Sequence, residues 1–201
     1  SDICCGAVLA AKNLISTIKS FAANSGGSLN AMTCYLIERS LKTLAIRVEK
    51  QNKNALEIAR YLETNALIRK VNYPGLENHP GFDIARKQMR AFGGMLSFEL
   101  NDQKINPHGF LRNLSLIRPA LSLGGVETIL THCWSMSHGA IPAEDKIRQG
   151  ISKRLLRISV GLEDIEDLED LDRWTGIDAE PAKKGKNGRK GKKGRKGTVR
   201  A

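Results

Sequence analysis

The ten residues LLRISVGLED, residues 155–164, constrain the fold of this chain more than any other segment. Leu156, Ile158 and Val160 alternate onto one face, which predicts a buried β-strand, and Arg157 falls on the opposite face. A guanidinium within so apolar a strand costs several kcal/mol if it is buried without an anionic partner. Arg157 is therefore either ion-paired across the sheet or faces a cleft that receives an anion. Its planar donor fork fits a carboxylate or a phosphate.

A second apolar segment, IRPALSLGGVET at residues 117–128, shows a similar pattern. Its alternating apolar residues predict one buried strand face, and Ser122 points the other way. The strand should end at Gly124 and Gly125, where the backbone can approach a ligand closely. A hydroxyl beside an arginine suits a carboxylate, although a serine facing solvent would give the same pattern. Together the two strands indicate anion recognition and nothing narrower.

Several strings carry a resemblance to a known family. They are RSLKTLAIRVEKQNKNALEIARYLE, VNYPGLENHPG, FGGMLSFEL, LSLGGVET, SMSH and LLRISVGLEDIEDL, in that order. They resemble the C-terminal half of the pyridoxal-phosphate-dependent trans-sulfuration enzymes, the Cys/Met metabolism family of cystathionine γ-synthases, cystathionine β- and γ-lyases and methionine γ-lyases. The resemblance runs from about Ser1 to about Asp172.

The resemblance implies a fold and a site. The fold is α/β overall, of the aspartate-aminotransferase-like fold type I. This chain would supply a remnant of the large domain and an α+β C-terminal domain with a mostly antiparallel sheet. In the family, the residues that correspond to Ser122 and Arg157 hold the α-carboxylate of a small amino-acid substrate. The implied cofactor is pyridoxal 5'-phosphate, and the implied assembly is a homo-oligomer, dimer or tetramer.

The implied reaction is β- or γ-elimination or replacement at a carbon–sulfur bond, on sulfur amino acids or homoserine esters. Cystathionine γ-synthases and γ-lyases carry an acidic residue immediately before the serine that corresponds to Ser122. Here that residue is Leu121, closer to the apolar residue of methionine γ-lyases. This difference disfavours recognition of a distal ammonium at Leu121 and leaves the reaction open.

The lysine that forms the Schiff base with the cofactor has no counterpart in this sequence. In the family it precedes a Gly-His-Ser-Asp-like stretch, whose end matches Ser1-Asp2, so we expect the lysine just upstream of residue 1. The groups that bind the cofactor phosphate and ring belong to the same N-terminal half. Lys19 has a Ser-x-x-Lys spacing but lies on the polar side of an amphipathic helix, and Lys42 matches a structural lysine. The chain alone is therefore expected to have no catalytic residue, no cofactor-binding residue and no activity.

The cysteines and histidines do not form a convincing pattern of their own. Cys4, Cys5, Cys34 and Cys133 do not pair sensibly, which favours free thiols in a reducing, cytoplasmic compartment. The cluster of His132, Cys133 and His138 does not have the spacing of a zinc site, and we expect it in a loop near the mouth of the active site, without a bound metal. No apolar run is long enough to span a membrane.

Periodicity gives a coarse layout. We expect a strand at residues 2–9 and a helix at 10–22, as the remnant of the large domain within 1–28. A connecting helical region (29–64), with its helical part near 31–63, precedes the small α+β domain (65–175).

The segment 176–201 ends the chain with a Lys/Gly-rich tail that carries ten basic and no acidic residues from 183 onward. Without these ten residues the formal net charge falls from +11 to +1. We expect the tail to be disordered. It is either a solvated extension, or the product of a rearranged reading frame, or an arm that binds polyanions such as nucleic acid without sequence specificity. The alternative function is thus a non-catalytic relict domain with a polyanion-binding tail.

Overall fold

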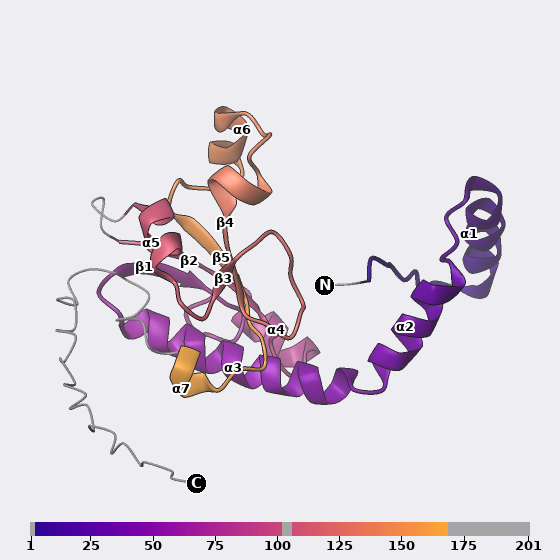
Figure 1. Cartoon of the computed structure of the whole chain (residues 1–201), viewed down its shortest axis with the longest axis horizontal. Helices are drawn as coiled ribbons and strands as arrows, with labels where there is room; N and C mark the ends of the chain where they lie inside the picture. The colour runs from indigo at the N-terminus through magenta and orange to yellow at the C-terminus, as the bar shows by residue number, and fades with distance from the viewer. Residues whose placement is uncertain (1–2, 102–105, 169–201) are drawn as a thin grey trace, which may run out of the picture.

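A computed structural model describes residues 3–101 and 106–168 of the chain (Figure 1). A five-stranded sheet lies against one long helix, and two further helices extend away from it as an N-terminal arm. The strands are β1 (Ile68–Asn72), β2 (Met95–Leu100), β3 (Arg118–Pro119), β4 (Ile129–His132) and β5 (Leu155–Ser159). The α-helices are α1 (Lys12–Ser25), α2 (Ala31–Leu41), α3 (Leu44–Thr64), α4 (Phe82–Gln88), α5 (Pro107–Asn113), α6 (Ala143–Arg148) and α7 (Ile165–Leu168). A π-helical turn, η1, spans Cys133–Ser137.

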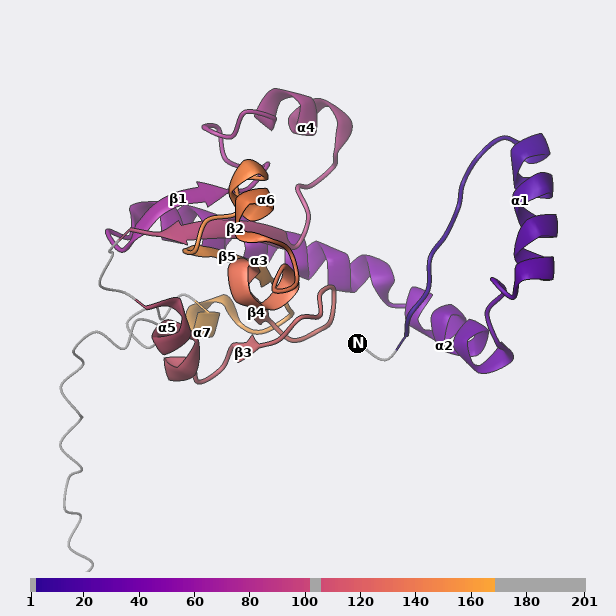
Figure 2. The ribbon, with the colours of Figure 1, turned by 90° about the horizontal axis from the view of Figure 1, so that it is seen from above.

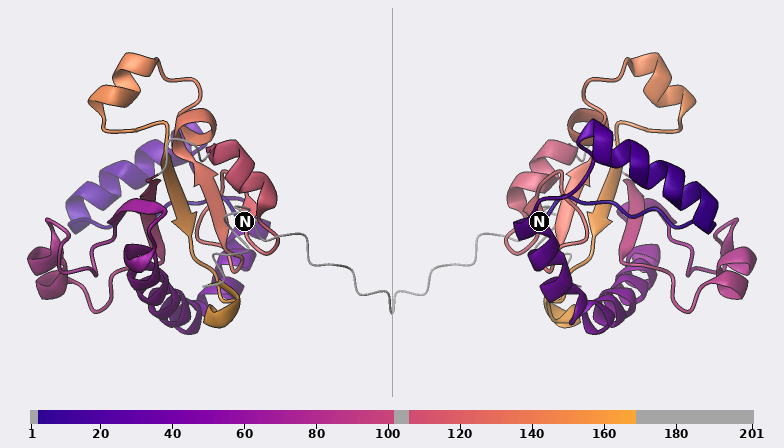
Figure 3. Two further views of the ribbon diagram at one scale, coloured as in Figure 1. Left: turned by 90° about the vertical axis from the view of Figure 1, so that its left-hand side faces the viewer. Right: turned by 90° about the vertical axis from the view of Figure 1, so that its right-hand side faces the viewer.

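The sheet has the strand order β1-β2-β5-β4-β3. Three of its four pairings are antiparallel, and only β3 and β4 run parallel. The predicted α+β arrangement with a mostly antiparallel sheet is confirmed. Figure 3 shows α3 along one face of this sheet, with α6 beyond the ends of β4 and β5.

The core lies between α3 and the sheet. Helix α3 presents Ala55, Ile58, Ala59 and Leu62, all fully buried, at the spacing of one helical face. Alternate residues of the central strands β2 and β5 pack against this face; these are Leu96, Phe98, Leu100, Leu156 and Ile158. The buried face predicted for residues 155–164 is therefore confirmed, and Arg157 lies on the other face of the sheet.

The N-terminal arm, residues 3–43, projects away from the sheet (Figure 2). Neither α1 nor α2 has a buried residue, and apolar side chains on them are exposed, among them Phe21 at 73%. The expected single helical region near 31–63 is divided at residues 42–43. Arg47 stabilises this break, because its guanidinium donates to the carbonyl of Ser40 at 2.8 Å, near the end of α2.

One predicted strand is wrong, and another is much shorter than expected. Residues 3–9 form no strand, because no other described segment pairs with them. The segment 117–128 leaves the sheet after the two residues of β3, so Ser122 lies in a loop, with Leu121 and Leu123 exposed. The strand that follows, β4, was not expected from the sequence pattern. The region of Cys133 and His138 is also not an irregular loop, since it contains the turn η1.

The predicted tail, residues 176–201, lies outside the described residues. In the part of the chain that the structure covers, no helix is long and apolar enough to cross a bilayer.

Candidate functional site: Arg157 and the Ser122 loop on the outer face of the sheet

Arg157 lies in the middle of β5, on the sheet face opposite α3. Its Nη2 donates to three neutral oxygens at 3.2 Å each: the carbonyls of Leu121 and Ser122 and the hydroxyl of Thr131. The structure therefore brings Arg157 and Ser122, both predicted site residues, to the same place. Contact is made through the Ser122 backbone, and the Ser122 side chain is half-buried.

The loop that carries Ser122 is fixed at both ends by strands β4 and β5. At its start, the amide of Ala120 donates to the carbonyl of Leu130 at 3.2 Å. At its end, the amide of Gly124 donates to the hydroxyl of Ser159 at 2.8 Å. Gly124 has a φ of 71°. This lies in the left-handed region, which favours glycine where the chain turns back. The short segment 121–123 is consequently held across the guanidinium of Arg157.

Among the described residues, no carboxylate forms an ion pair with Arg157. Its Nε is buried and has no hydrogen-bond partner there. A buried charged donor without a partner is costly, and a carboxylate oxygen would satisfy it. The arrangement thus has the chemistry of an anion site, with a guanidinium that has an unpartnered donor beside a serine loop.

The thiol of Cys133 lies close enough to Arg157 for the positive charge to affect its pKa. Burial raises the pKa of the Cys133 thiol, while the positive charge of Arg157 and a hydrogen bond with Ser137 act in the opposite direction. The thiol is buried next to the guanidinium, which is consistent with a reduced, protonated side chain. All four cysteines are free; Cys4, Cys5 and Cys34 are exposed on the arm.

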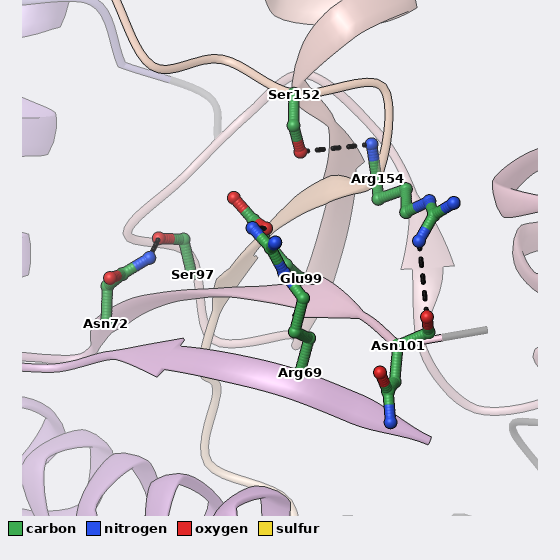
Figure 4. Close-up of polar contacts among 7 residues, drawn as sticks. All are labelled: Arg69, Asn72, Ser97, Glu99, Asn101, Ser152 and Arg154. Atoms are coloured by element: carbon green, nitrogen blue, oxygen red, sulfur yellow. Dashed lines mark hydrogen bonds and ion pairs between the residues drawn. The ribbon is translucent and has the colours of Figure 1, made fainter. Parts of the chain in front are cut away.

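Polar side chains continue from Arg157 across the outer face of the sheet. Ser97 on β2 is the register partner of Arg157, and Asn72 on β1 is the partner of Ser97. Figure 4 shows Asn72 and Ser97 directed at each other, and their side chains are joined by a hydrogen bond of 3.2 Å. Nearby, Arg69 forms an ion pair with Glu99, which neutralises the buried carboxylate of Glu99. This outer face is therefore polar, whereas the α3 face is apolar.

The residues His132, Cys133 and His138 have structural contacts. The ring of His132 is bound on both sides, Nε2 at 2.9 Å from the Lys153 carbonyl and Nδ1 at 2.7 Å from the Ser135 hydroxyl. His138 Nδ1 lies 2.9 Å from the Ser137 hydroxyl. Within residues 3–101 and 106–168, no group of three or more His, Cys, Asp or Glu side chains is arranged to hold a metal ion.

We predict that His132 makes the folded chain less stable in acid. A carbonyl only accepts, so Nε2 carries the proton and Nδ1 accepts from Ser135. Burial lowers the pKa of His132 below its ordinary 6.5, the Lys153 hydrogen bond partly offsets this, and neighbouring His108 lowers it further. Because the unfolded chain binds the proton first, this contribution to stability is complete above pH 6.5 and is lost as the pH falls through the lower, folded pKa.

The measurement is a ¹H–¹³C titration of the His132 ring together with urea unfolding between pH 8 and 5. A His132 pKa at or above that of an unfolded histidine would contradict the prediction. Stability that is flat over this pH range in the wild type, or that declines equally in His132→Phe, would contradict it as well.

Three lysines make contacts within the protein. Lys146 is buried, but its Nζ donates to the carbonyls of Trp134 at 3.0 Å and Gly139 at 3.4 Å. Lys42 pairs with Glu38, and Lys50 with Asp164. The guanidinium of Arg157 beside the Ser122 loop has the chemistry to bind a small anionic group, a carboxylate or a phosphate.

The sequence profile of the Cys/Met metabolism PLP-dependent enzymes matches residues 1–174. The chain therefore belongs to this family of pyridoxal-phosphate-dependent enzymes. Solved structures agree: a cystathionine γ-lyase from Lactobacillus plantarum, complexed with L-serine, superimposes with a TM-score of 0.79 at 38% identity, over 83% of this chain and 44% of that one. The fold is accordingly that of the fold type I enzymes.

Relatives of different activity are similarly close. A cystathionine β-lyase of Lactococcus lactis subsp. cremoris (strain MG1363) is 46% identical over 166 residues, which are 82% of this chain and 43% of that protein. A cystathionine γ-synthase of Escherichia coli (strain K12) is 41% identical over 165 residues, which are 82% of this chain and 43% of that protein. An L-methionine γ-lyase of Fusobacterium nucleatum subsp. polymorphum is 40% identical over 166 residues, 82% of this chain and 42% of that protein.

The chain thus spans less than half the length of these relatives. Nothing in the comparisons supports the alternative of a non-catalytic relict with a polyanion-binding tail, and the tail lies beyond the matched residues.

Proposed function

We propose that this chain supplies the substrate-carboxylate site of a pyridoxal-phosphate-dependent enzyme that makes or breaks carbon–sulfur bonds in amino acids. Arg157 and Ser122 are the residues that hold the α-carboxylate. The observation that supports this most directly is the buried Nε of Arg157, which lacks a partner beside the Ser122 loop. Family membership supports the same assignment.

The role of these residues is to bind and to orient. A carboxylate that accepts from the guanidinium and from the Ser122 loop is held in place, so that the direction of the Cα–H bond is fixed once the amino group is held as well. Pyridoxal phosphate, when bound, withdraws electrons from Cα and makes its proton acidic. The outer face of the sheet would thereby present the substrate in the one orientation from which that proton can leave.

The reaction stays within the family's range of β- or γ-elimination and replacement on sulfur amino acids or homoserine esters. Leu121, 59% exposed beside the site, offers no charge to the distal ammonium of a substrate such as cystathionine. We therefore favour recognition of a side chain without a distal charge by this loop.

One experiment tests whether this chain needs the rest of the family's fold in order to bind the cofactor and to be active. A chimera would join residues 1–174 to the portion of the Lactococcus cystathionine β-lyase that the match does not cover. After treatment with pyridoxal phosphate and borohydride, we expect peptide mass spectrometry to find the cofactor at one specific lysine of the chimera. The 201-residue chain alone should show neither such labelling nor lyase activity, since its Ser-x-x-Lys spacing, at Lys19, lies exposed on α1.

Specific labelling of one lysine in the isolated chain would contradict the prediction. A chimera that binds the cofactor and yet does not convert any sulfur amino acid would contradict the proposed function.

The exposed arm supports a proposal on domains and assembly. Residues 1–28 would belong to the large domain, 29–64 would connect the domains, and 65–175 would form the small domain. Apolar side chains exposed on one continuous segment are usually covered in a complete assembly; here they include Val8, Leu9, Phe21, Met32 and Tyr35. We propose that the large domain and a homo-oligomer, dimer or tetramer, cover this arm. The four free cysteines favour a cytoplasmic location.

The basic tail makes a separate prediction. If residues 183–201 bind polyanions by counterion release, affinity for duplex DNA should fall with salt with a log–log slope of roughly −0.9 per phosphate neutralised. Deleting the tail should abolish this binding and leave the unfolding transition unchanged. Fluorescence anisotropy between 50 and 300 mM salt is the measurement, and binding that survives either the deletion or high salt would contradict the prediction.

A further inference from the structure

Thr131 is a buried threonine in direct contact with the proposed carboxylate site. It lies on β4 as the register partner of Arg157 and is 0% exposed. Its hydroxyl acts both as an acceptor and as a donor. It accepts from Arg157 Nη2 at 3.2 Å and donates to the carbonyl of Ala120. One buried hydroxyl therefore connects the guanidinium to the loop opposite it.

The carbonyl that Thr131 binds lies only two residues before Ser122. Ala120 is also held through its amide by Leu130, so β4 fixes this residue from both sides. The three-residue segment that follows crosses Arg157, and two of its carbonyls, those of Leu121 and Ser122, accept from the same Nη2. Arg157, Thr131 and Ala120 thus form a closed connection between the two halves of the site.

This connection affects how much freedom Arg157 has before a ligand binds. An arginine side chain has many rotamers, and ordering it on binding weakens affinity. A guanidinium already held on its Nη2 side keeps its Nε donor directed at one place, so a carboxylate binds without that loss. At position 131 a hydroxyl accepts from Arg157 and donates to Ala120 through a single oxygen atom, which an apolar side chain of the same shape cannot do.

We propose that Thr131 is a positioning residue, which holds both Arg157 and the Ser122 loop in the geometry that receives a carboxylate. The inference rests on the proposed function of Arg157 and Ser122 and deepens it. Thr131 itself does not contact the carboxylate; it acts through Arg157.

The test follows the side-chain Nε–H signal of Arg157 in the ¹⁵N-labelled 201-residue chain, assigned by its loss in Arg157→Lys. Thr131→Val keeps the shape of the side chain but removes both hydrogen bonds, and Thr131→Ser restores the hydroxyl. The probe is sodium acetate, with acetamide as an uncharged molecule of the same shape. In Thr131→Val we expect Nε–H exchange to accelerate, and acetate affinity to fall, by roughly ten-fold each, the effect of one hydrogen bond.

Thr128→Val is the matched control. Thr128 is equally buried, at 1% exposed, and its hydroxyl also makes one bond of each kind, donating to Glu163 at 2.7 Å and accepting from the Gly161 amide at 2.8 Å. The two valine variants should therefore lose similar thermal stability. Only Thr131→Val should change the Arg157 signal and the acetate affinity, and Thr131→Ser should recover both.

Three results would overturn the inference. Unchanged Arg157 exchange in Thr131→Val would do so, as would an equal change in Thr128→Val, or a Thr131→Ser variant that behaves like Thr131→Val. A failure of the proposed function would give a different result, because acetate would then not change the Arg157 Nε–H signal of the wild type. In that case, altered Nε–H exchange in Thr131→Val, with recovery in Thr131→Ser, still supports positioning of Arg157 by Thr131.

Discussion

Arg157→Lys in the chimera should lower kcat/KM for its amino-acid substrate by roughly ten- to a hundred-fold, the effect of about 1.5–3 kcal/mol from one charge-assisted contact. Lysine keeps the positive charge but has no planar fork, so the carboxylate loses one hydrogen bond and its fixed orientation. Lysine also lacks the Nε donor that Arg157 leaves unpartnered in a buried position. Steady-state kinetics with the substrate on which the chimera is active would measure this loss.

The same preparation contains its own control. Cofactor binding, followed by absorbance, should stay near normal in Arg157→Lys, since we assign Arg157 to the substrate. Ser122→Ala should show the same pattern more weakly, because a neutral hydroxyl contributes less than a guanidinium. Release of the cofactor by Arg157→Lys would make Arg157 a phosphate ligand, and an unchanged kcat/KM would make it structural. Either result contradicts the proposed site.

The central strands of this fold could be predicted from sequence because their periodicity is local information. Alternation in MLSFEL and LLRIS identifies β2 and β5 and the face of each that meets α3. The charge of Arg157 in such a strand pointed to an unusual outer face, and the structure does place it beside Ser122. The pairing of these two strands with each other was not predicted from the sequence.

The loop around Ser122 shows where local pattern is insufficient. Its alternating leucines predicted a strand, but Leu121 and Leu123 are exposed. The backbone there is bound by side chains from β5 instead of by a neighbouring strand, through Ser159 at one point and Arg157 at another. These contacts join residues about 35 positions apart, so no window of sequence contains them.

Thr131 was missed for a related reason. In the sequence it is one β-branched residue in TILTH, which suits any buried strand. Its importance arises only from the register that places it opposite Arg157 and from the return of the chain at Ala120.

Gly161→Ala should destabilise the folded chain by about 2–5 kcal/mol, from overpacking and from loss of the hydrogen bonds that depend on this backbone. A methyl group at Gly161 would meet the carbonyl oxygen of Val126, the Glu163 carboxylate and, at 2.6 Å, the carbonyl carbon of Glu127. Two of these three neighbours are backbone, which cannot rotate away. The Gly161 amide also donates to Thr128, and its carbonyl accepts from the buried Asn54. A shift that relieves the overlap would therefore strain the end of β5, the loop at 124–127 and α3 together.

The matched substitution Gly109→Ala should act in the opposite direction. Gly109 lies within α5, and a methyl group there would find its nearest atom, Asn106 Cβ, at 3.8 Å, an ordinary van der Waals contact. Alanine in a helix interior is favoured over glycine by about 0.5–1 kcal/mol, so this variant should be as stable as the wild type or slightly more stable. Urea unfolding of the three proteins measures both effects. If Gly161→Ala unfolds at the same urea concentration as Gly109→Ala, the close approach of β5 to the loop at 124–127 is wrong, and with it the support of the Ser122 loop.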